Sequence, residues 1–357
     1  MIKYYGLGAE KRLNEIVMAG SHDAGITGGG GNAQTQKLDI LGQALAGVRL
    51  FDLRIAGADS KKSVELKTYH GKQTKSKVTK NIVGLQGGAQ KVVQSRMALG
   101  TWGESLLPIL ADARGFVTTY STEFLLLKFD KCKNWEQIAA LAVQELGNTL
   151  YTASGNLNKK TLADLKGKVI VLFTSAGLAE IDQQYHGAGG ILGIKNLSSG
   201  GDYKSDYNGL QYYGKGGTDL TTRKGKSIQE NYDKQLKLMK AGAAENPNVM
   251  GMMYWTTTGV VGNIRKRNKV MWQPQNITEL QRLWSSGMGD AVKERIPDCI
   301  DASSYVGGLI LKRFLPNIVM IDFASPRKCQ TIFDLNRAIP TELTKMEQLM
   351  IEIRKLV

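Results

Sequence analysis

The stretch IVMAGSHDAG, residues 16–25, is an apolar run that ends in a polar turn. A continuous apolar run of this length predicts a short strand that is buried on both faces. Its end, Ser21-His22-Asp23, places an imidazole and a carboxylate side by side where the strand leaves the core. The chain has only three histidines. A single histidine at a strand end most often only caps the strand. A catalytic role for His22 therefore depends on which residues the other strands place beside it.

Apolar runs of this kind recur along the chain and are mostly separated by helical patterns. The predicted strands are residues 15–21, 48–57, 64–71, 123–131, 168–176, 226–232, 248–257 and 317–325, of which 226–232 is the weakest. The predicted helices are residues 38–48, 135–147, 231–242 and 303–315. Eight strands that alternate with helices favour a closed parallel barrel over an open sheet. The predicted fold class is therefore α/β, a distorted TIM-type (β/α)8 barrel in a single domain with long glycine-rich loops.

Two glycine-rich segments are predicted to be loops. Residues 26–35, ITGGGGNAQT, follow His22 and lack the lysine of a phosphate-binding loop, so we interpret them as a flexible loop over the barrel mouth. Residues 186–217 are the longest irregular segment, and segments of that length are usually functional or mobile. The third histidine, His186, begins this segment, and we expect it to have a structural role. No Gly-x-Gly-x-x-Gly follows the first strand, which disfavours a dinucleotide-binding fold.

The composition of the 357-residue chain is that of a globular protein, with 42% hydrophobic and 22% charged residues. No apolar run approaches the roughly 18 residues that a membrane span needs. The N-terminal residues lack the apolar core of a secretory signal, so the chain is expected to be cytosolic, processed, or exported by a route without such a signal. Of these possibilities, we favour a protein that is secreted or otherwise delivered outside the producing cell. Cys132, Cys299 and Cys329 are too few and scattered for a disulfide framework or zinc site, and we expect buried thiols.

The formal net charge of +15 predicts a polyanionic partner, either nucleic acid or the face of an anionic bilayer. Basic clusters occur at residues 75–80, 221–226 and 264–269. Aromatic residues make up only 7% of the chain, whereas proteins that bind single strands usually stack bases on aromatic side chains. These features favour peripheral binding to an anionic membrane and no nucleic-acid partner.

Polar side chains gather where the predicted strands end. The candidates are His22, Asp23, Asp52, Arg54, His70, Lys128, Asp130 and Asp322. In a parallel barrel, the carboxyl ends of the strands meet at one mouth, where the chemistry of such folds takes place. Two histidines and an arginine, without a further histidine or carboxylate cluster at metal spacing, suit phosphodiester cleavage by a general base and a general acid. The arginine offers a fork of donors to phosphate oxygens, and an aspartate can hold a histidine in one tautomer.

The segments IVMAGSHDAGIT, NAQTQKLDILGQALAGVRLFDLRI and TYHG, in this order, resemble the catalytic X region of bacterial phosphatidylinositol-specific phospholipase C. The similarity is close over residues 15 to about 175. The segments SIQENYD (227–233) and NIVMIDFAS (317–325) resemble later strands of that family more loosely. The resemblance implies a catalytic barrel over residues 1–340 and a C-terminal helix over residues 341–357 that packs on the barrel.

The resemblance also implies a reaction. His22 would be the general base that takes the proton of the inositol 2-hydroxyl, and His70 the general acid that protonates the departing diacylglycerol oxygen. Arg54 would bind the phosphate of phosphatidylinositol. The products would be inositol 1,2-cyclic phosphate and diacylglycerol, in a first step that needs no water.

Supporting roles follow from the same resemblance. Asp23 would lie beside the arginine at the phosphate, Asp322 would orient the first histidine, and Asp52 would support the arginine and histidine network. The predicted substrate-binding residues are Lys128, Asp130, Glu230 and Tyr232, of which the last two would contact the inositol ring.

The resemblance implies that neither a metal ion nor another cofactor is needed. In calcium-dependent relatives an acidic residue stands where this chain has Arg54, whose charge takes over the role of the ion. The chain departs from the family pattern in VLFTSAG (171–177), where Thr174-Ser175 stand in place of an expected inositol-binding arginine. This departure concerns headgroup specificity more than the phosphodiester chemistry.

A monomeric phospholipase C is expected, and two alternatives remain open. A metal-dependent glycerophosphodiesterase or sphingomyelinase-like barrel would need a carboxylate cluster, and Arg54 argues against it. A barrel that binds lipid or nucleic acid without catalysis would have no need of a paired base and acid.

Overall fold

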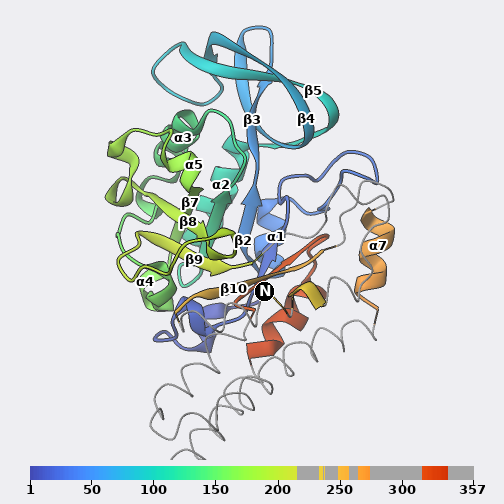
Figure 1. Ribbon diagram of the computed structural model, residues 1–357, viewed down its shortest axis with the longest axis vertical. Coiled ribbons are helices and arrows are strands. Elements are labelled where there is room, and N and C mark those ends of the chain that lie inside the picture. The colour runs from blue at the N-terminus through green and yellow to red at the C-terminus, as the bar shows by residue number, and fades with distance from the viewer. Residues whose placement is uncertain (215–232, 236, 238–247, 257–263, 274–315, 337–357) are drawn as a thin grey trace, which may run out of the picture.

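The computed structural model describes residues 1–214, 233–235, 237, 248–256, 264–273 and 316–336 (Figure 1). Its centre is a closed barrel of parallel strands, each hydrogen-bonded to the next and the last to the first. In spatial order they are β1 (Met18–Ser21), β11 (Ile318–Ile321), β10 (Met250–Trp255), β9 (Gly209–Tyr213), β8 (Ile191–Asn196), β7 (Lys168–Thr174), β6 (Phe124–Phe129) and β2 (Val48–Leu53). The predicted TIM-type barrel is confirmed.

The barrel strands are buried on both faces, as their continuous apolar runs require. All six residues of β2 and of β6 are buried. On the outer face, Phe129 of β6 and Phe173 of β7 lie side by side with ring centroids 5.4 Å apart, and Trp135 packs on the second ring. Residues of the other parity, such as Asp52 and Lys128, therefore point to the barrel interior. The inner face thus carries the charged pair Asp52 and Lys128.

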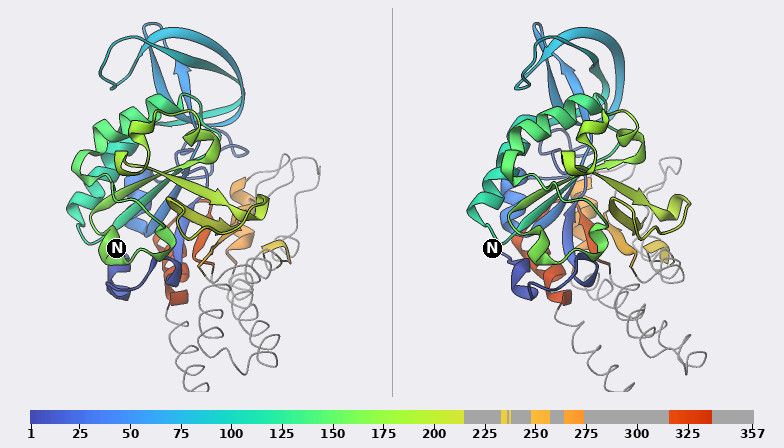
Figure 2. Two further views of the ribbon diagram at one scale, coloured as in Figure 1. Left: turned by 60° about the vertical axis from the view of Figure 1, so that its left-hand side comes forward. Right: turned by 90° about the vertical axis from the view of Figure 1, so that its left-hand side faces the viewer.

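Helices cover the outside of the barrel, as Figure 2 shows for the early part of the chain. The helices in the described part of the chain include α1 (Ile40–Ala46), α2 (Leu106–Thr119), α3 (Trp135–Leu146), α4 (Leu162–Leu165), α5 (Ser175–Leu178), α7 (Ile264–Met271) and the helical residues 326–336. The predicted helices at 38–48 and 135–147 correspond to α1 and α3. Asp39 caps the N-terminus of α1 by accepting a hydrogen bond from the Gly42 amide. Of the prediction at 231–242 only 233–235 and 237 are described, as helix, and 303–315 lies outside the described residues.

A second sheet stands on top of the barrel in Figures 1 and 2 and is formed by β3 (Ile55–Asp59), β4 (Ser63–Ile82) and β5 (Gln90–Ser105). β4 is antiparallel to both of its neighbours, and the three strands close on themselves. The prediction that residues 64–71 form a barrel strand is wrong, because they belong to β4. Their burial alternates along the strand, which marks one covered face and one open face, whereas barrel strands are covered on both.

The long segment 186–217, predicted to be irregular, contains two barrel strands, β8 and β9. They complete the eight strands in place of residues 64–71 and of the predicted strand at 226–232, which lies outside the described residues. The glycines here allow the backbones of β8 and β9 to approach closely. A Cβ on Gly209 would lie 1.9 Å from the carbonyl oxygen of Gly193, its partner on the neighbouring strand. A glycine-rich composition was therefore misread as a loop.

Two of the three cysteines, Cys132 and Cys329, are buried free thiols, as predicted, and Cys299 lies outside the described residues. Burial raises the pKa of the Cys329 thiol to about 12. Among the helices of the described residues, none has the length and apolar character that a bilayer span requires.

Candidate active site

His22 follows β1 at the barrel mouth and has its ring fixed from both sides. Its Nδ1 lies 2.9 Å from Oδ1 of Asp322, which follows β11, and its Nε2 lies 3.6 Å from Oδ2 of Asp23. The ring also meets Tyr254 edge-on at a centroid distance of 6.1 Å. The Nδ1–H therefore donates to a fully buried carboxylate, and Nε2 is the nitrogen left for proton transfer.

Asp23 is the centre of the site. Its Oδ1 lies 3.1 Å from Nε of Arg54, and its Oδ2 lies 2.9 Å from Nδ1 of His70. The residue has φ of 44°, a left-handed conformation that is unusual outside glycine and is often found at functional sites. Burial alone would raise the pKa of this carboxyl, but the neighbouring His22 and Arg54 outweigh burial and hold the pKa well below its usual range. One carboxylate thus joins two imidazoles and a guanidinium.

His70 reaches the mouth from the second sheet, where it lies on β4. Its Nδ1–H donates to Asp23, so Nε2 is available to a ligand, and 28% of the side chain is exposed. The Arg54 side chain, between β2 and β3, is 23% exposed. The partly exposed groups of the cluster are therefore the two that would meet an anionic substrate. The second sheet contributes one of them and is part of the site.

The charge of His22 is set by opposing effects. Burial alone lowers the pKa of this imidazole, but the Asp23 charge and the Asp322 hydrogen bond outweigh burial and raise the pKa to about 9. Near neutral pH the His22 ring is therefore an imidazolium beside Asp23, and neutral His22 becomes abundant only as the pH approaches that value.

A second charged group lies inside the barrel. Lys128 on β6 is buried and donates to Asp52 of β2 at 2.6 Å, and its Nζ lies 3.8 Å from Oδ2 of Asp130. Burial alone would lower the pKa of the lysine, but Asp52 reverses the effect and raises the pKa. Asp52 was predicted to support the arginine and histidine network, and its carboxylate does lie within 4.8 Å of ligand atoms of His22 and Asp23; its ion-pair partner is Lys128. The side chain of Asp130 is 33% exposed; Glu230 and Tyr232 lie outside the described residues.

Several polar residues hold the site from behind, and sequence reasoning missed them. Gln36 Nε2 donates to the carbonyl oxygens of His22 and Ile321, at 3.0 and 3.1 Å. Lys328 Nζ donates to the Asp322 carbonyl oxygen at 2.8 Å. Thr35 Oγ1 donates to the Asp23 carbonyl oxygen at 2.8 Å, which ties the end of the glycine-rich loop to the site. These contacts are to backbone atoms and leave no pattern in the sequence.

The described residues include one group that could approach a metal ion: His22, Asp23 and Asp52 offer ligand atoms within 4.8 Å of one another. Both carboxylates of this group already face cations, since Asp23 pairs with Arg54 and Asp52 with Lys128. The electrostatics are those of a site that receives an anion. The residues can bind a phosphate and can move protons on two sides of it.

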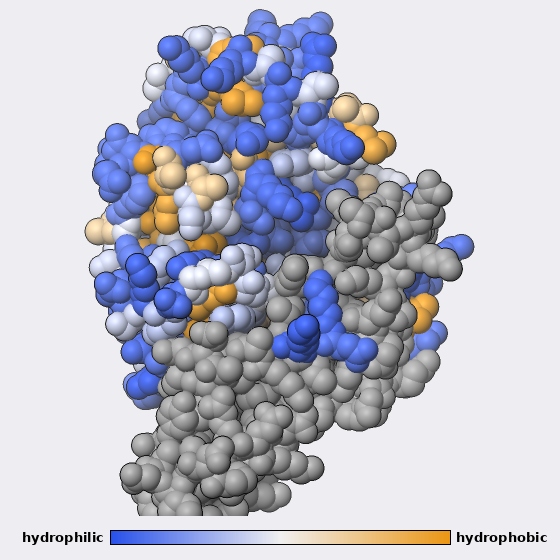
Figure 3. Space-filling view, in the orientation of Figure 1, coloured by the Kyte–Doolittle hydropathy of each residue, from blue (hydrophilic) through white to orange (hydrophobic). Residues whose placement is uncertain are grey.

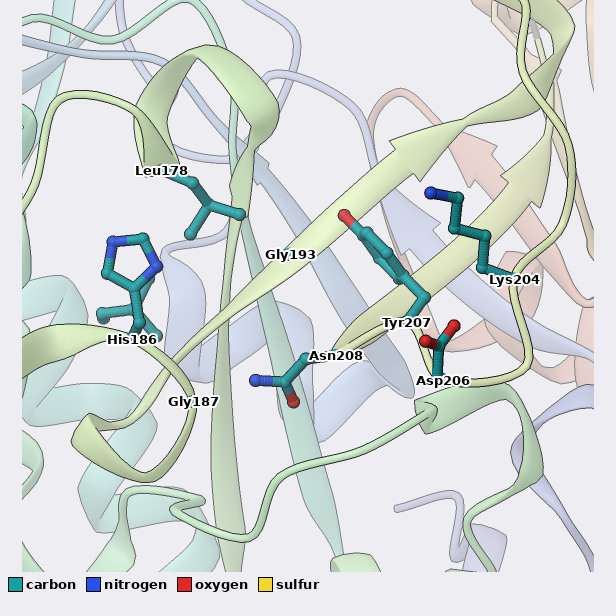
Figure 4. A pocket seen from close by; sticks show the side chains of 9 residues that line it. Leu178, His186, Gly187, Gly193, Lys204, Asp206, Tyr207 and Asn208 are labelled. Atoms are coloured by element: carbon teal, nitrogen blue, oxygen red, sulfur yellow. The ribbon is translucent and has the colours of Figure 1, made fainter. Parts of the chain in front are cut away.

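A cavity of about 330 Å³ lies elsewhere on the molecule and is shown in Figure 4. It opens on the outer face of β8, and its lining includes His186, Lys204, Asp206, Tyr207 and Asn208. None of the candidate catalytic side chains lines it. The structural role predicted for His186 agrees with this position, away from the barrel mouth.

Comparison with known proteins relates the chain to others by structure. No family model and no curated protein matches its sequence. The structure is similar to the phosphatidylinositol-specific phospholipase C from Listeria monocytogenes, with 15% identity over 92% of this chain and 95% of that chain and a TM-score of 0.52. A double mutant of the phosphatidylinositol-specific phospholipase C from S. aureus matches with 16% identity over 92% of this chain and 93% of that chain, with a TM-score of 0.49. The chain shares the barrel fold of the first of these proteins over nearly its whole length.

Proposed function

We propose that the chain is a phospholipase C that cleaves the phosphodiester of phosphatidylinositol at a membrane surface without a metal ion. The observation that carries this proposal is the Asp23 carboxylate, which joins two histidines and an arginine at the mouth of a barrel. The likeness in fold to a phosphatidylinositol-specific phospholipase C supports the choice of substrate.

In the proposed reaction the inositol 2-hydroxyl attacks phosphorus. Nε2 of His22 takes the hydroxyl proton, the new P–O bond closes a cyclic phosphate, and the bond between phosphorus and the diacylglycerol oxygen breaks. Nε2–H of His70 protonates that oxygen as it leaves. Arg54 stabilises the charge that develops on the phosphate oxygens, and such donors act strongly in a site that excludes water. One P–O bond forms as another breaks, one proton passes to His22 and one leaves His70, so this step needs no co-reactant.

Asp23 and Asp322 act through the histidines in this proposal. The Asp322 hydrogen bond keeps the proton of His22 on Nδ1 and so leaves Nε2 as the base. Asp23 accepts the Nδ1–H of His70, which leaves the Nε2–H of that ring to act as the acid, and it keeps Arg54 beside the site. Because the pKa of His22 is raised to about 9, only the neutral fraction of the ring works as base below that pH.

The test is hydrolysis of purified phosphatidylinositol in the presence of a strong chelator, followed by phosphorus NMR. We expect turnover that is unchanged by chelation or added calcium, with a cyclic phosphate as first product. Activity that is lost on chelation and restored by calcium would instead support a metal-dependent phosphodiesterase. Vesicle binding with no turnover at all would support the non-catalytic alternative.

A further inference from the structure

The second sheet carries an exposed surface beside the candidate site, which we call the hairpin bend: residues 71–77 of β4 and residues 95–100 of β5. The two strands are paired here, with Gly71 opposite Gly100 and Lys72 opposite Leu99. His70 is the residue directly before this segment, so the bend begins at the candidate catalytic group. Figures 1 and 2 show the sheet standing clear of the barrel.

The bend is built into the backbone by the pair of glycines. Both have positive φ, 129° at Gly71 and 117° at Gly100. A Cβ on either one would lie 2.0 Å from a carbonyl oxygen of the opposite strand, so no other residue fits. Beyond the glycines the hairpin turns back, and Lys80 and Arg96 both reach Asp59 on β3. Most residues of 71–77 are exposed to solvent in this arrangement.

The bend exposes a large apolar side chain, Leu99. Leu99 is 69% exposed, more than any other large hydrophobic residue of the described chain, of which the next is Met1 at 48%. Single exposed apolar residues are common, so the leucine is informative only together with its surroundings. Figure 3 shows that the surface over this sheet is mainly hydrophilic with isolated hydrophobic residues.

Those surroundings are basic. Lys72, Lys75 and Lys77 are all exposed, and none takes part in an ion pair among the described residues. By contrast, Lys80 and Arg96 in the same sheet share the carboxylate of Asp59. Lys72 thus lies directly opposite the protruding leucine, and Lys75 and Lys77 follow along the same strand. This combination suits an anionic bilayer, where the lysines meet lipid phosphates and the leucine enters the boundary of the acyl region.

We propose that the hairpin bend is the surface by which the enzyme docks on an anionic membrane, with the barrel mouth held over the lipid headgroups. This inference rests on the proposed function for its purpose, but docking is measurable without turnover. The net charge of +15 predicts attraction to an anionic bilayer but does not say which surface of the molecule binds it. The proposal assigns this binding to the surface beside His70.

The test compares two triple variants with the same loss of charge. The first is Lys72→Gln, Lys75→Gln, Lys77→Gln at the bend. The control is Lys3→Gln, Lys159→Gln, Lys166→Gln, three exposed lysines outside the second sheet. Binding is measured by co-sedimentation with vesicles of phosphatidylcholine and phosphatidylglycerol in equal parts. At about 1 kcal/mol per basic residue, the bend variant should bind about a hundredfold more weakly, and the control should change only slightly. Equal losses in both variants would overturn the proposal.

Leu99→Ala tests the apolar contribution separately. We expect vesicle binding to weaken roughly tenfold, since most of a leucine side chain is then no longer buried in lipid. This loss should persist at high salt, whereas the effect of the lysines should disappear as the charges are screened. A Leu99→Ala protein that binds as tightly as the wild type would exclude insertion of the leucine.

Hydrolysis of a short-chain, monomeric phosphatidylinositol separates docking from chemistry. The bend variants should retain this activity while losing activity on vesicles, and far-ultraviolet circular dichroism should match the wild type. If the wild type binds vesicles through the bend but cleaves neither substrate, the proposed function fails and the docking surface stands. Failure of the wild type to bind vesicles, or equally tight binding of single-stranded DNA that is lost in the same variant, would overturn the docking proposal.

Discussion

At the scale of single residues, the site depends on one carboxylate with three neighbours. Asp23 lies within 3.6 Å of His22, within 2.9 Å of His70 and within 3.1 Å of Arg54. Because the carboxylate is buried, these groups compensate its charge among the described residues, and it in turn holds His70 and Arg54 in place. Changes at any of the four residues are therefore expected to act on the others.

The assignment of base and acid can be tested with a substrate whose leaving group needs no proton. His22→Ala and His70→Ala should each lower kcat on phosphatidylinositol by about 10²–10⁴-fold, the usual contribution of a general acid or base. On a p-nitrophenyl ester of inositol phosphate, His70→Ala should recover most of this loss and His22→Ala should not. Recovery by His22→Ala instead would show that the two histidines have exchanged roles.

Asp322 is expected to control the ionisation of His22. Asp322→Asn removes a negative charge that stabilises the imidazolium, so the pKa of His22 should fall below its value of about 9. An NMR titration of the imidazole measures this directly, and the limb of the kcat/KM profile near that pH should move to lower pH with it. The isosteric amide preserves the packing. An unchanged pKa would show that Asp322 does not act through this hydrogen bond.

At the scale of elements, the second sheet is predicted to position the candidate acid through its glycine pair. Gly71→Ala places a methyl group against the opposite backbone at a positive φ, which should destabilise the protein by about 1–3 kcal/mol. Since His70 precedes this residue, kcat should fall as well. Urea unfolding and turnover of a soluble substrate measure the two effects.

Gly115→Ala is the matched control. Gly115 lies in α2 with open space around it and ordinary φ, so alanine there should stabilise the protein by about 0.5–1 kcal/mol without changing kcat. If Gly71→Ala behaved like this control, the bend would not depend on glycine.

At the scale of the whole molecule, one buried ion pair joins the chain's beginning to the barrel. Arg49 of β2 donates to Glu123 at 2.7 Å, and the carboxylate of Glu123 also accepts from the amides of Tyr4 and Tyr5. Both charged side chains are fully buried. The pair thus fixes the N-terminal segment to strands that are remote in sequence.

Glu123→Gln should therefore destabilise the fold by about 3–5 kcal/mol, because it leaves the Arg49 charge buried without its counter-ion. The measurement is the free energy of unfolding in urea, with Glu10→Gln, an exposed residue, as the control. A loss no larger than that of the control would mean that other groups compensate the arginine.

The sequence by itself determined the fold class and most of the candidate site. Continuous apolar runs mark strands that are covered on both faces, and polar residues at their ends mark the barrel mouth. This was enough to bring His22, Asp23, Arg54 and His70 together in one hypothesis, and the structure brings them into contact.

Only the tertiary structure decided which strands close the barrel and which charges pair. Residues 64–71 belong to the second sheet, β8 and β9 arise from a glycine-rich segment, and Asp52 pairs with Lys128. The physical reason is that a hydrophobic pattern reports how far a residue is buried but not which residue covers it. Even the contact of His22 with Asp322, which the family resemblance implied, joins residues 300 positions apart, and it forms because β1 pairs with β11 when the barrel closes.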